Sequence, residues 1–248
     1  MTLVLLVRHG LTAVTGSVLS GWTPGVSLDD RGAAQAHALA ARLAPVPLDA
    51  IVCSPLDRCQ QTAGAIRDGR DEPVPFHTDE RVGECKYGDW TNQPLKKLAA
   101  DPLWPVVQQH PSAVRFPGPG GEAVVDMQHR AVSAVRDWNT RLGPTGVYLV
   151  CSHGDVIKAI VADALGLHLD QYQRIQADPC SLTVIRYTPL RPFVVRMNDT
   201  GGDVTGIIRR GEAAADGGTA SSDGAVGGGA GDSAPAAGRE TITADAQG

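Results

Sequence analysis

Two apolar runs, far apart in the chain, each end in a His-Gly pair. Residues 3–7 (LVLLV) lead into RHG at 8–10, and residues 147–151 (VYLVC) lead into SHG at 152–154. Each run has the length and the aliphatic content of a buried β-strand. Ligands of an open parallel sheet bind beyond the carboxyl ends of its strands. If the two strands are neighbours, both histidines face one cleft.

A third apolar run ends in a similar way. Residues 50–53 (AIVC) are expected to form a short strand, and the SPLDR that follows at 54–58 places an arginine one turn into a helix. Two guanidinium groups and two imidazoles would then surround the first turn of the helix after the second histidine, where backbone amides favour anions. Phosphate fits that geometry best. The four side chains are those of Arg8, His9, Arg58 and His153.

Glycine follows each of the two histidines. Without a Cβ, Gly10 and Gly154 are predicted to let the backbone approach a ligand closely. The amide of Gly154 would be the first donor of the helix that begins there.

Strands and helices alternate along most of the chain. Helices are expected at 33–43, where Ser27 to Asp30 has the spacing of a capping box, after Ser54 as an N-cap with proline at the first position, at 124–142 and at 156–165. Further strands are expected at 146–151 and, as a closing hairpin, at 182–187 and 193–197. This order predicts an α/β fold, a three-layer α/β/α sandwich with a mostly parallel sheet.

Composition divides the chain at about residue 210. Residues 211–248 are mostly Gly, Ala, Ser and Asp, and their six acidic residues and one basic residue account for the whole formal net charge of −5. Such a segment buries too little apolar surface to fold, so a disordered tail is predicted at 211–248 after a domain at 1–210. The neutral domain carries no bulk charge signal for nucleic acid or membrane.

Cysteine usage and hydropathy point to the cytoplasm. The five cysteines form an odd set without CxxC spacing, which favours reduced thiols over a disulfide framework. No apolar run approaches the ~20 residues of a membrane span. We therefore expect a cytoplasmic protein of unknown oligomeric state.

An ordered set of motifs resembles the histidine phosphatase superfamily, also called phosphoglycerate mutase-like, and within it actinobacterial probable phosphomutases and phosphatases. The motifs are VLLVRHGLT, SGWTPGVSLDDRGAAQA, VCSPLDRCQQTA, GECKYGDW, PGGE and LVCSHGDVIKAIV, which occur in this order between residues 3 and 198. The resemblance implies the same three-layer fold and phosphoryl transfer through a phosphohistidine.

The resemblance also implies roles for individual residues. His9 would be the nucleophile, and Glu84 would protonate the leaving oxygen, which requires a raised pKa. His153 would assist catalysis and bind the phosphoryl group. The other expected phosphate ligands are Arg8, Arg58, Thr12, Thr15 and Gly154, and the expected substrate contacts are Gly21 and Trp22. Thr15 departs from the family, which commonly has asparagine there.

Several alternatives remain open. A metal-dependent hydrolase is disfavoured because HxH, HExxH and DxD clusters are missing, and a kinase because GxxxxGK[ST] is missing. The resemblance implies no metal and no cofactor. A catalytically idle phosphate sensor is the rival of another class, and a phosphomutase is the rival enzyme.

Specificity for a small phosphorylated substrate is expected in the insert at 90–122, a predicted lid. Its candidate contacts are Lys96, Lys97, Trp104, His110 and Arg115. A mutase needs an extended basic lid that excludes water, whereas this one is short, so hydrolysis is the predicted reaction.

Overall fold

One mixed sheet of six strands forms the centre of the computed structural model, which describes residues 1–202. The strand order is β4-β3-β6-β1-β7-β8. The first four strands run parallel to one another, β7 pairs antiparallel with β1, and β8 pairs antiparallel with β7. The strands are β1 (Thr2–Arg8), β3 (Ala50–Cys53), β4 (Phe76–Thr78), β6 (Val147–Ser152), β7 (Leu182–Tyr187) and β8 (Pro192–Asp199). The predicted tail at 211–248 lies outside the described residues.

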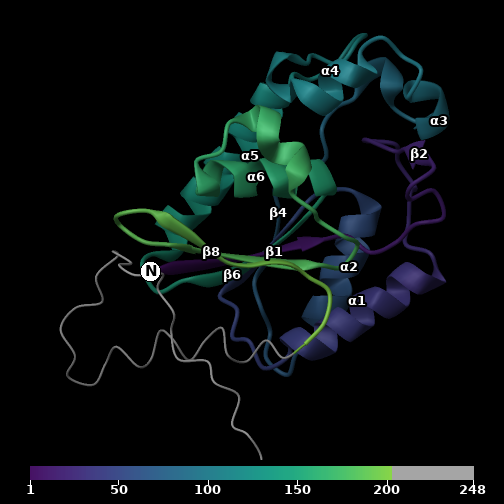
Figure 1. Ribbon diagram of the computed structural model, residues 1–248. Helices are drawn as coiled ribbons and strands as arrows, with labels where there is room; N and C mark the ends of the chain where they lie inside the picture. The colour runs from purple at the N-terminus through teal and green to yellow at the C-terminus, as the bar shows by residue number, and fades with distance from the viewer. Residues whose placement is uncertain (203–248) are drawn as a thin grey trace, which may run out of the picture.

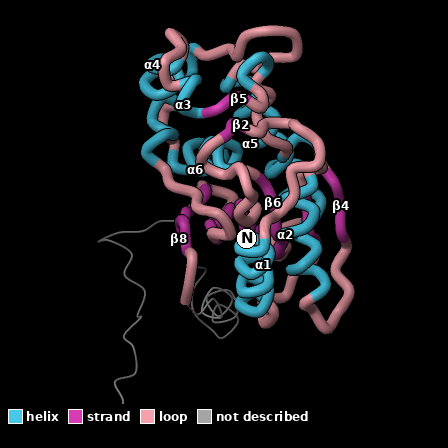
Figure 2. The backbone as a smooth tube through the Cα atoms, turned by 90° about the vertical axis from the view of Figure 1, so that its right-hand side faces the viewer, coloured by secondary structure: helices cyan, strands magenta, loops and turns pink. Residues whose placement is uncertain are grey.

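Helices cover both faces of the sheet, so the three-layer prediction is confirmed (Figure 1). One face carries α1 (Asp30–Leu43) and α2 (Asp57–Asp68), which lie side by side in Figure 2. The other face carries α5 (Val124–Leu142) and α6 (Gly154–Leu165). The apolar positions of α5 recur every three or four residues, and most of them are buried against the sheet.

Two helix starts differ from the sequence prediction. The N-cap of α1 is Asp29, whose carboxylate accepts a hydrogen bond from the Gly32 amide at 2.8 Å, and not Ser27. Helix α2 begins after Leu56, so Ser54 is not its N-cap. At α1 two polar residues compete for the cap position, whereas the N-cap position of α2 is taken by Leu56, which makes no side-chain cap.

The predicted lid is built mostly of short elements above the sheet. After η1 (Glu80–Val82) the chain forms η2 (Gly88–Trp90), β5 (Gln93–Pro94), α3 (Leu95–Leu98), α4 (Trp104–Gln109) and η3 (Pro111–Ala113). Strand β5 pairs with β2 (Val18–Leu19), which ties this segment to the loop after β1. A last short helix, η4 (Leu169–Arg174), follows α6.

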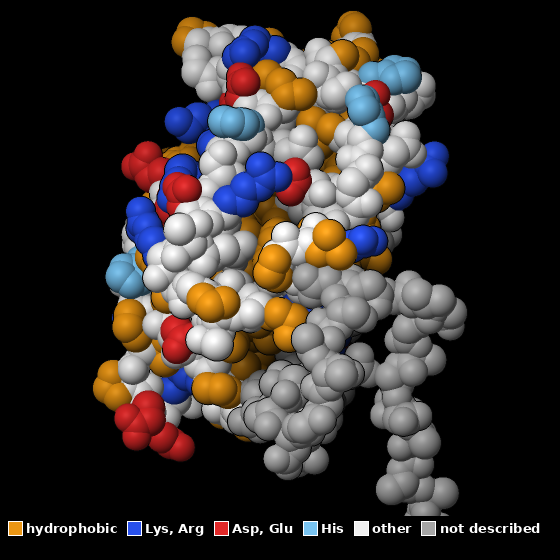
Figure 3. Space-filling model, turned by 90° about the vertical axis from the view of Figure 1, so that its left-hand side faces the viewer, with side chains coloured by type: hydrophobic (Ala, Val, Ile, Leu, Met, Phe, Trp, Pro, Cys, Tyr) orange, Lys and Arg blue, Asp and Glu red, His pale blue; other side chains and the backbone are white. Residues whose placement is uncertain are grey.

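Within residues 1–202, no helix combines the length and apolar content that crossing a bilayer requires. On the face drawn in Figure 3, basic side chains lie beside acidic ones and are not gathered into a single belt.

Candidate active site

The two histidines lie at the carboxyl ends of adjacent parallel strands. Arg8 pairs with Ser152 at the end of the β1–β6 ladder, and the His9 amide donates to the Ser152 carbonyl at 3.1 Å. The chain leaves the sheet at the next residue of each strand, so the rings of His9 and His153 lie with their centroids 5.2 Å apart. The two apolar runs therefore end side by side, but only His9 lines the cavity described below, because His153 is fully buried behind it.

His9 is held through both ring nitrogens, and one of them is unprotonated. Its Nδ1 lies 2.7 Å from the Gly10 carbonyl, which can only accept, so Nδ1 carries the proton. Nε2 then accepts a hydrogen bond from Arg58 Nε at 3.3 Å. Burial, followed by the charges of Arg58 and Arg8, lowers the pKa of His9 to about 3. The imidazole is therefore neutral at physiological pH, and Nε2, whose lone pair faces Arg58 Nε, is its unprotonated nitrogen.

The two arginines keep unused donors in this buried site. Arg58 Nη2 donates to the Gly21 carbonyl at 2.9 Å, and Arg8 Nη1 donates to the Ala177 carbonyl at 2.7 Å. Arg58 Nη1 and Arg8 Nε are buried without a hydrogen-bond partner. A buried unpaired donor costs about 1–3 kcal/mol. An oxyanion between the guanidinium groups would satisfy both donors.

His153 is fixed from both sides. Its Nε2 lies 2.8 Å from the Ser54 hydroxyl, and its Nδ1 lies 3.2 Å from Arg58 Nη2. Burial and the charge of Arg58 hold the pKa of His153 well below its usual range. The Ser54 hydroxyl, expected as a helix cap, therefore orients this ring.

Glu84 has the properties of a proton donor. Its Oε2 lies 3.8 Å from His153 Nδ1, and its Oε1 accepts from the Cys85 amide at 2.9 Å. Burial, followed by the negative charge of Asp155, raises the pKa of Glu84 to about 7, although Arg58 and Arg8 oppose the shift. The raised pKa that the proposed role requires is thus produced by the protein itself.

The backbone around Glu84 is clamped by side chains outside the cavity. The indole of Trp22 donates to the Glu84 carbonyl at 2.5 Å, and Arg130 Nη2 donates to the same oxygen at 2.9 Å. Arg130 also binds the Gly83 carbonyl and pairs with Glu122 at 2.6 Å. Trp22, predicted to contact substrate, does not line the cavity. Sequence reasoning missed Arg130, although its partner Glu122 belongs to the PGGE motif.

Thr12 and Thr15 fold the loop after β1 into a turn. Their hydroxyls lie 2.9 Å apart, and the Thr15 hydroxyl accepts from the Thr12 amide at 3.0 Å. Both residues line the cavity. Thr15, at the position of the family's asparagine, therefore keeps a polar group at the phosphate end of the cavity.

The two glycines that follow the histidines have different surroundings, and only one of them is required for packing. A Cβ on Gly10 would come within 2.6 Å of the Gly32 carbonyl, so this glycine is required for packing against α1. The prediction that it makes room for a ligand is wrong. A Cβ on Gly154 would meet only the Arg8 side chain, at an ordinary 3.6 Å. Gly154 borders the cavity as the first residue of α6.

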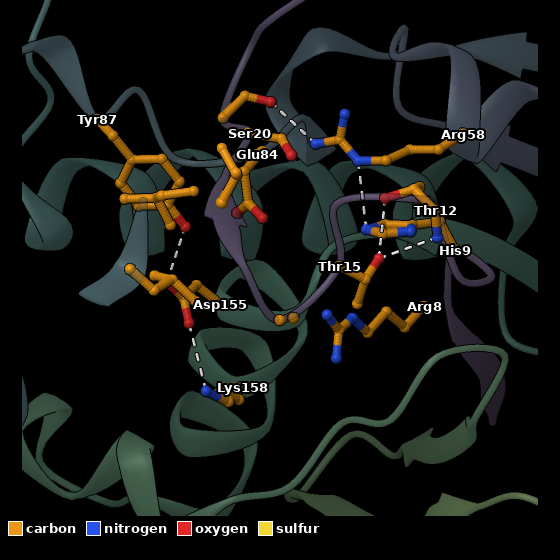
Figure 4. Close-up of a pocket in the computed structure, with 16 residues that line it drawn as sticks. Arg8, His9, Thr12, Thr15, Ser20, Arg58, Glu84, Tyr87, Asp155 and Lys158 are labelled. Carbon is orange, nitrogen blue, oxygen red and sulfur yellow. Dashed lines mark hydrogen bonds and ion pairs between the residues drawn. The ribbon is translucent and has the colours of Figure 1, made fainter. Parts of the chain in front are cut away.

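Residues at the strand ends and in the loop after β1 border a cavity of about 240 Å³ (Figure 4). It extends from His9 and the arginines to a far end that the sequence analysis missed, formed by Tyr87, Asp155 and Lys158. Gly21 also lines it, with an apolar wall of Val18, Leu19 and Leu95.

The five basic and aromatic lid residues singled out in the sequence lie elsewhere. Trp104 stacks on Trp90, Lys97 binds Gln93, Arg115 pairs with Asp126, His110 lies near Asp170 and Lys96 is exposed. None of these five borders the cavity in this structure. Chain composition alone does not say which way a lid side chain points.

Within residues 1–202, no group of three or more His, Cys, Asp or Glu side chains is placed to hold a metal ion. Arg58 instead contacts both rings, His9 Nε2 at 3.3 Å and His153 Nδ1 at 3.2 Å, and burial, together with the positive charges of Arg58 and Arg8, lowers the pKa values of both histidines.

Known proteins share both the sequence and the fold. The model of the histidine phosphatase superfamily (branch 1) matches residues 4–200. A 2,3-bisphosphoglycerate-dependent phosphoglycerate mutase of Gloeobacter violaceus is 28% identical over 73% of this chain and 83% of its own. A glucosyl-3-phosphoglycerate phosphatase of Mycolicibacterium vanbaalenii is 33% identical over 68% of this chain and 76% of its own.

The fold agrees as closely. The solved structure of Bacillus stearothermophilus YhfR, 29% identical, covers 80% of this chain and 98% of its own, with a TM-score of 0.73. Family model, relatives and fold agree with the geometry of the two histidines and two arginines. The chain belongs to the histidine phosphatase superfamily, branch 1.

Proposed function

We propose that this enzyme hydrolyses a small phosphorylated metabolite through a phosphohistidine on His9. The observation that carries the proposal is the neutral His9 ring, with its Nε2 lone pair beside two buried guanidinium donors that lack partners. Phosphoryl transfer needs positioning and charge stabilisation, and these groups supply both.

In the first step, the Nε2 lone pair of His9 attacks phosphorus and the ester P–O bond breaks. Arg8, Arg58 and the amide at the start of α6 stabilise the charge on the phosphoryl oxygens, and His153 holds Arg58 in place. The leaving alkoxide takes the proton of Glu84, whose raised pKa keeps that proton available near neutral pH.

In the second step, water replaces the departed alcohol. The Glu84 carboxylate accepts a proton from water as the water oxygen attacks phosphorus. The P–N bond breaks and its electron pair returns to His9, which releases inorganic phosphate and restores the free enzyme.

Hydrolysis is favoured over mutase action by the position of the lid bases. A mutase must hold a second anionic group of its product while phosphohistidine persists. Lys96, Lys97 and Arg115 lie outside the cavity, and Leu95 is the lid residue that borders it. Lys158 is the one further cation in the cavity wall among the described residues, and it is paired with Asp155 at 3.3 Å.

The test of the proposal is where the phosphoryl group goes. With 3-phosphoglycerate and a trace of 2,3-bisphosphoglycerate, we expect inorganic phosphate to exceed 2-phosphoglycerate because water can enter beside the short lid. Both products are followed in one reaction by nuclear magnetic resonance. Rapid formation of 2-phosphoglycerate with little phosphate release would establish the mutase instead.

Activity should persist in chelators. Arginines beside both histidines repel cations and supply the charge that a metal would otherwise provide. We expect kcat/KM for p-nitrophenyl phosphate to be unchanged in EDTA. Loss of activity that one divalent metal restores would support a metal-dependent hydrolase.

We further propose that residues 1–210 are a complete catalytic domain in a reducing compartment such as the cytoplasm. All five cysteines are buried free thiols, and the partner we propose is a small phosphorylated molecule, not nucleic acid or a membrane. The cavity is lined entirely by residues 8–158. No oligomeric state is proposed.

A chain ending at Arg210 should match the full chain in melting temperature and in turnover. The reason is that residues 211–248 contain only two branched aliphatic residues, Val226 and Ile242, and so little to bury. Thermal unfolding and steady-state kinetics of the two chains make the comparison. A fall of several degrees in the shorter chain would show that the removed segment stabilises the domain.

A further inference from the structure

The far end of the cavity differs in chemistry from the phosphate end. Asp155, in the first turn of α6, lines it together with Tyr87 and Lys158 (Figure 4). The Tyr87 hydroxyl donates to Asp155 Oδ2 at 2.9 Å, and Lys158 Nζ lies 3.3 Å from Asp155 Oδ1. Lys158 Nζ also donates to Gln173 at 3.1 Å. The Tyr87 hydroxyl and two of the three N–H donors of Lys158 therefore already have acceptors.

The carboxylate oxygens of Asp155 can still accept further hydrogen bonds. Each carboxylate oxygen can accept about two hydrogen bonds, and each oxygen of Asp155 has one such contact with Tyr87 or Lys158. The Asp155 side chain is 25% exposed, so a ligand can reach it. Among the described residues lining the cavity, the buried donors without partners belong to Arg8 and Arg58 at the other end. One end of the cavity thus offers donors and the other offers acceptors.

Charge points the same way. An anionic group at the far end would meet the Asp155–Lys158 pair, whose charges balance each other, and the carboxyl of Glu84, so it would find no net positive charge there. The side chains of Val18, Leu19 and Leu95, which also line the cavity, are apolar. A short alcohol with hydroxyl or ammonium groups on one side fits this lining.

From this arrangement, and resting on the proposed function, we infer that Asp155 selects phosphomonoesters whose alcohol carries a hydrogen-bond donor and no second anionic group. The Asp155 carboxylate accepts from the hydroxyl or ammonium group of the alcohol. It repels a carboxylate in the same position. Asp155 is therefore a specificity residue for this reaction, and Tyr87 and Lys158 orient it.

Three esters of equal chain length test the inference. Glycerol 1-phosphate has a terminal hydroxyl where 3-phosphoglycerate has a carboxylate, and propyl phosphate has neither. We expect wild-type kcat/KM for glycerol 1-phosphate to exceed that for each of the others about tenfold or more, the scale of one hydrogen bond to a charged group. Asp155→Asn should reduce the preference of the enzyme for glycerol 1-phosphate over 3-phosphoglycerate about tenfold. Asp163→Asn, on the outer surface of α6 beside Arg136, should leave it unchanged.

Ratios between esters remove any general effect of Asp155 on Glu84, because that effect is common to all three. The same ratios are measured as dissociation constants in the His9→Ala background by calorimetry. The inference would be overturned if Asp155→Asn changed the ratios between the esters by less than about twofold. It would also be overturned if the wild type preferred 3-phosphoglycerate and Lys158→Met removed that preference. If wild type hydrolyses none of the esters while binding still discriminates, the proposed function fails and the inference stands.

Discussion

Replacing His9 with alanine is expected to lower turnover of any phosphomonoester by roughly 10⁴-fold or more, the scale on which loss of a covalent nucleophile acts in other enzymes. Without Nε2, the two guanidinium groups still bind phosphate, but no side chain at the strand end can take the phosphoryl group. Binding of inorganic phosphate should therefore survive while hydrolysis is lost. Steady-state assays and calorimetry on the same protein separate the two effects.

The matched control is His37→Ala, which removes an exposed histidine from α1. It should keep full activity and the wild-type melting temperature. Circular dichroism of the His9→Ala protein should show the wild-type spectrum, because His9 lies where β1 leaves the sheet and not within its ladder. A folded His9→Ala protein with near wild-type turnover would rule out the phosphohistidine mechanism.

Replacing Glu84 with glutamine is expected to lower kcat/KM for alkyl phosphates about 10²–10⁴-fold, the usual contribution of general acid catalysis. For p-nitrophenyl phosphate the loss should be only several-fold, because nitrophenolate leaves without a proton. Glu80→Gln, at an exposed position in the same segment, is the control and should change neither rate. Equal losses for both ester types in Glu84→Gln would exclude the proposed proton transfer.

The same residue sets the expected pH dependence. Glu84 faces His153, Asp155, Arg58 and Arg8, and its pKa is raised to about 7 by burial and by Asp155. The acid must be protonated to donate, so kcat/KM for alkyl phosphates should fall as pH rises through about 7. Glu84→Gln should abolish this limb. The lowered pKa of His9, about 3, keeps the nucleophile neutral across this range.

The phosphate end of the site could be predicted from sequence because strand ends are local features. An apolar run stops where the chain leaves the sheet, and parallel strands end at one edge, so His9, His153 and Arg8 had to lie close together. Arg58 follows because a helix begins shortly after β3. The long amphipathic helix α5 and the closing hairpin were predictable from their periodicity for the same reason.

The remaining contacts depend on packing between distant segments. Arg130 reaches the Glu84 backbone from the middle of α5, and no spacing in the sequence connects them. Asp155 and Tyr87 meet only because α6 and the loop after η1 pack together. Lid side chains such as Lys96 are basic but do not border the cavity. Ser54 carries a helix-cap signal that its hydrogen bond to His153 overrides.

The central claim is that His9 carries the phosphoryl group between the two steps. The direct test is a brief reaction with a ³²P-labelled ester, quenched in alkali, followed by digestion and mass spectrometry of the labelled peptide. We predict base-stable, acid-labile phosphate on His9 of the wild type and none on His9→Ala. Turnover without such a label, or an acid-stable label on another residue, would contradict the account.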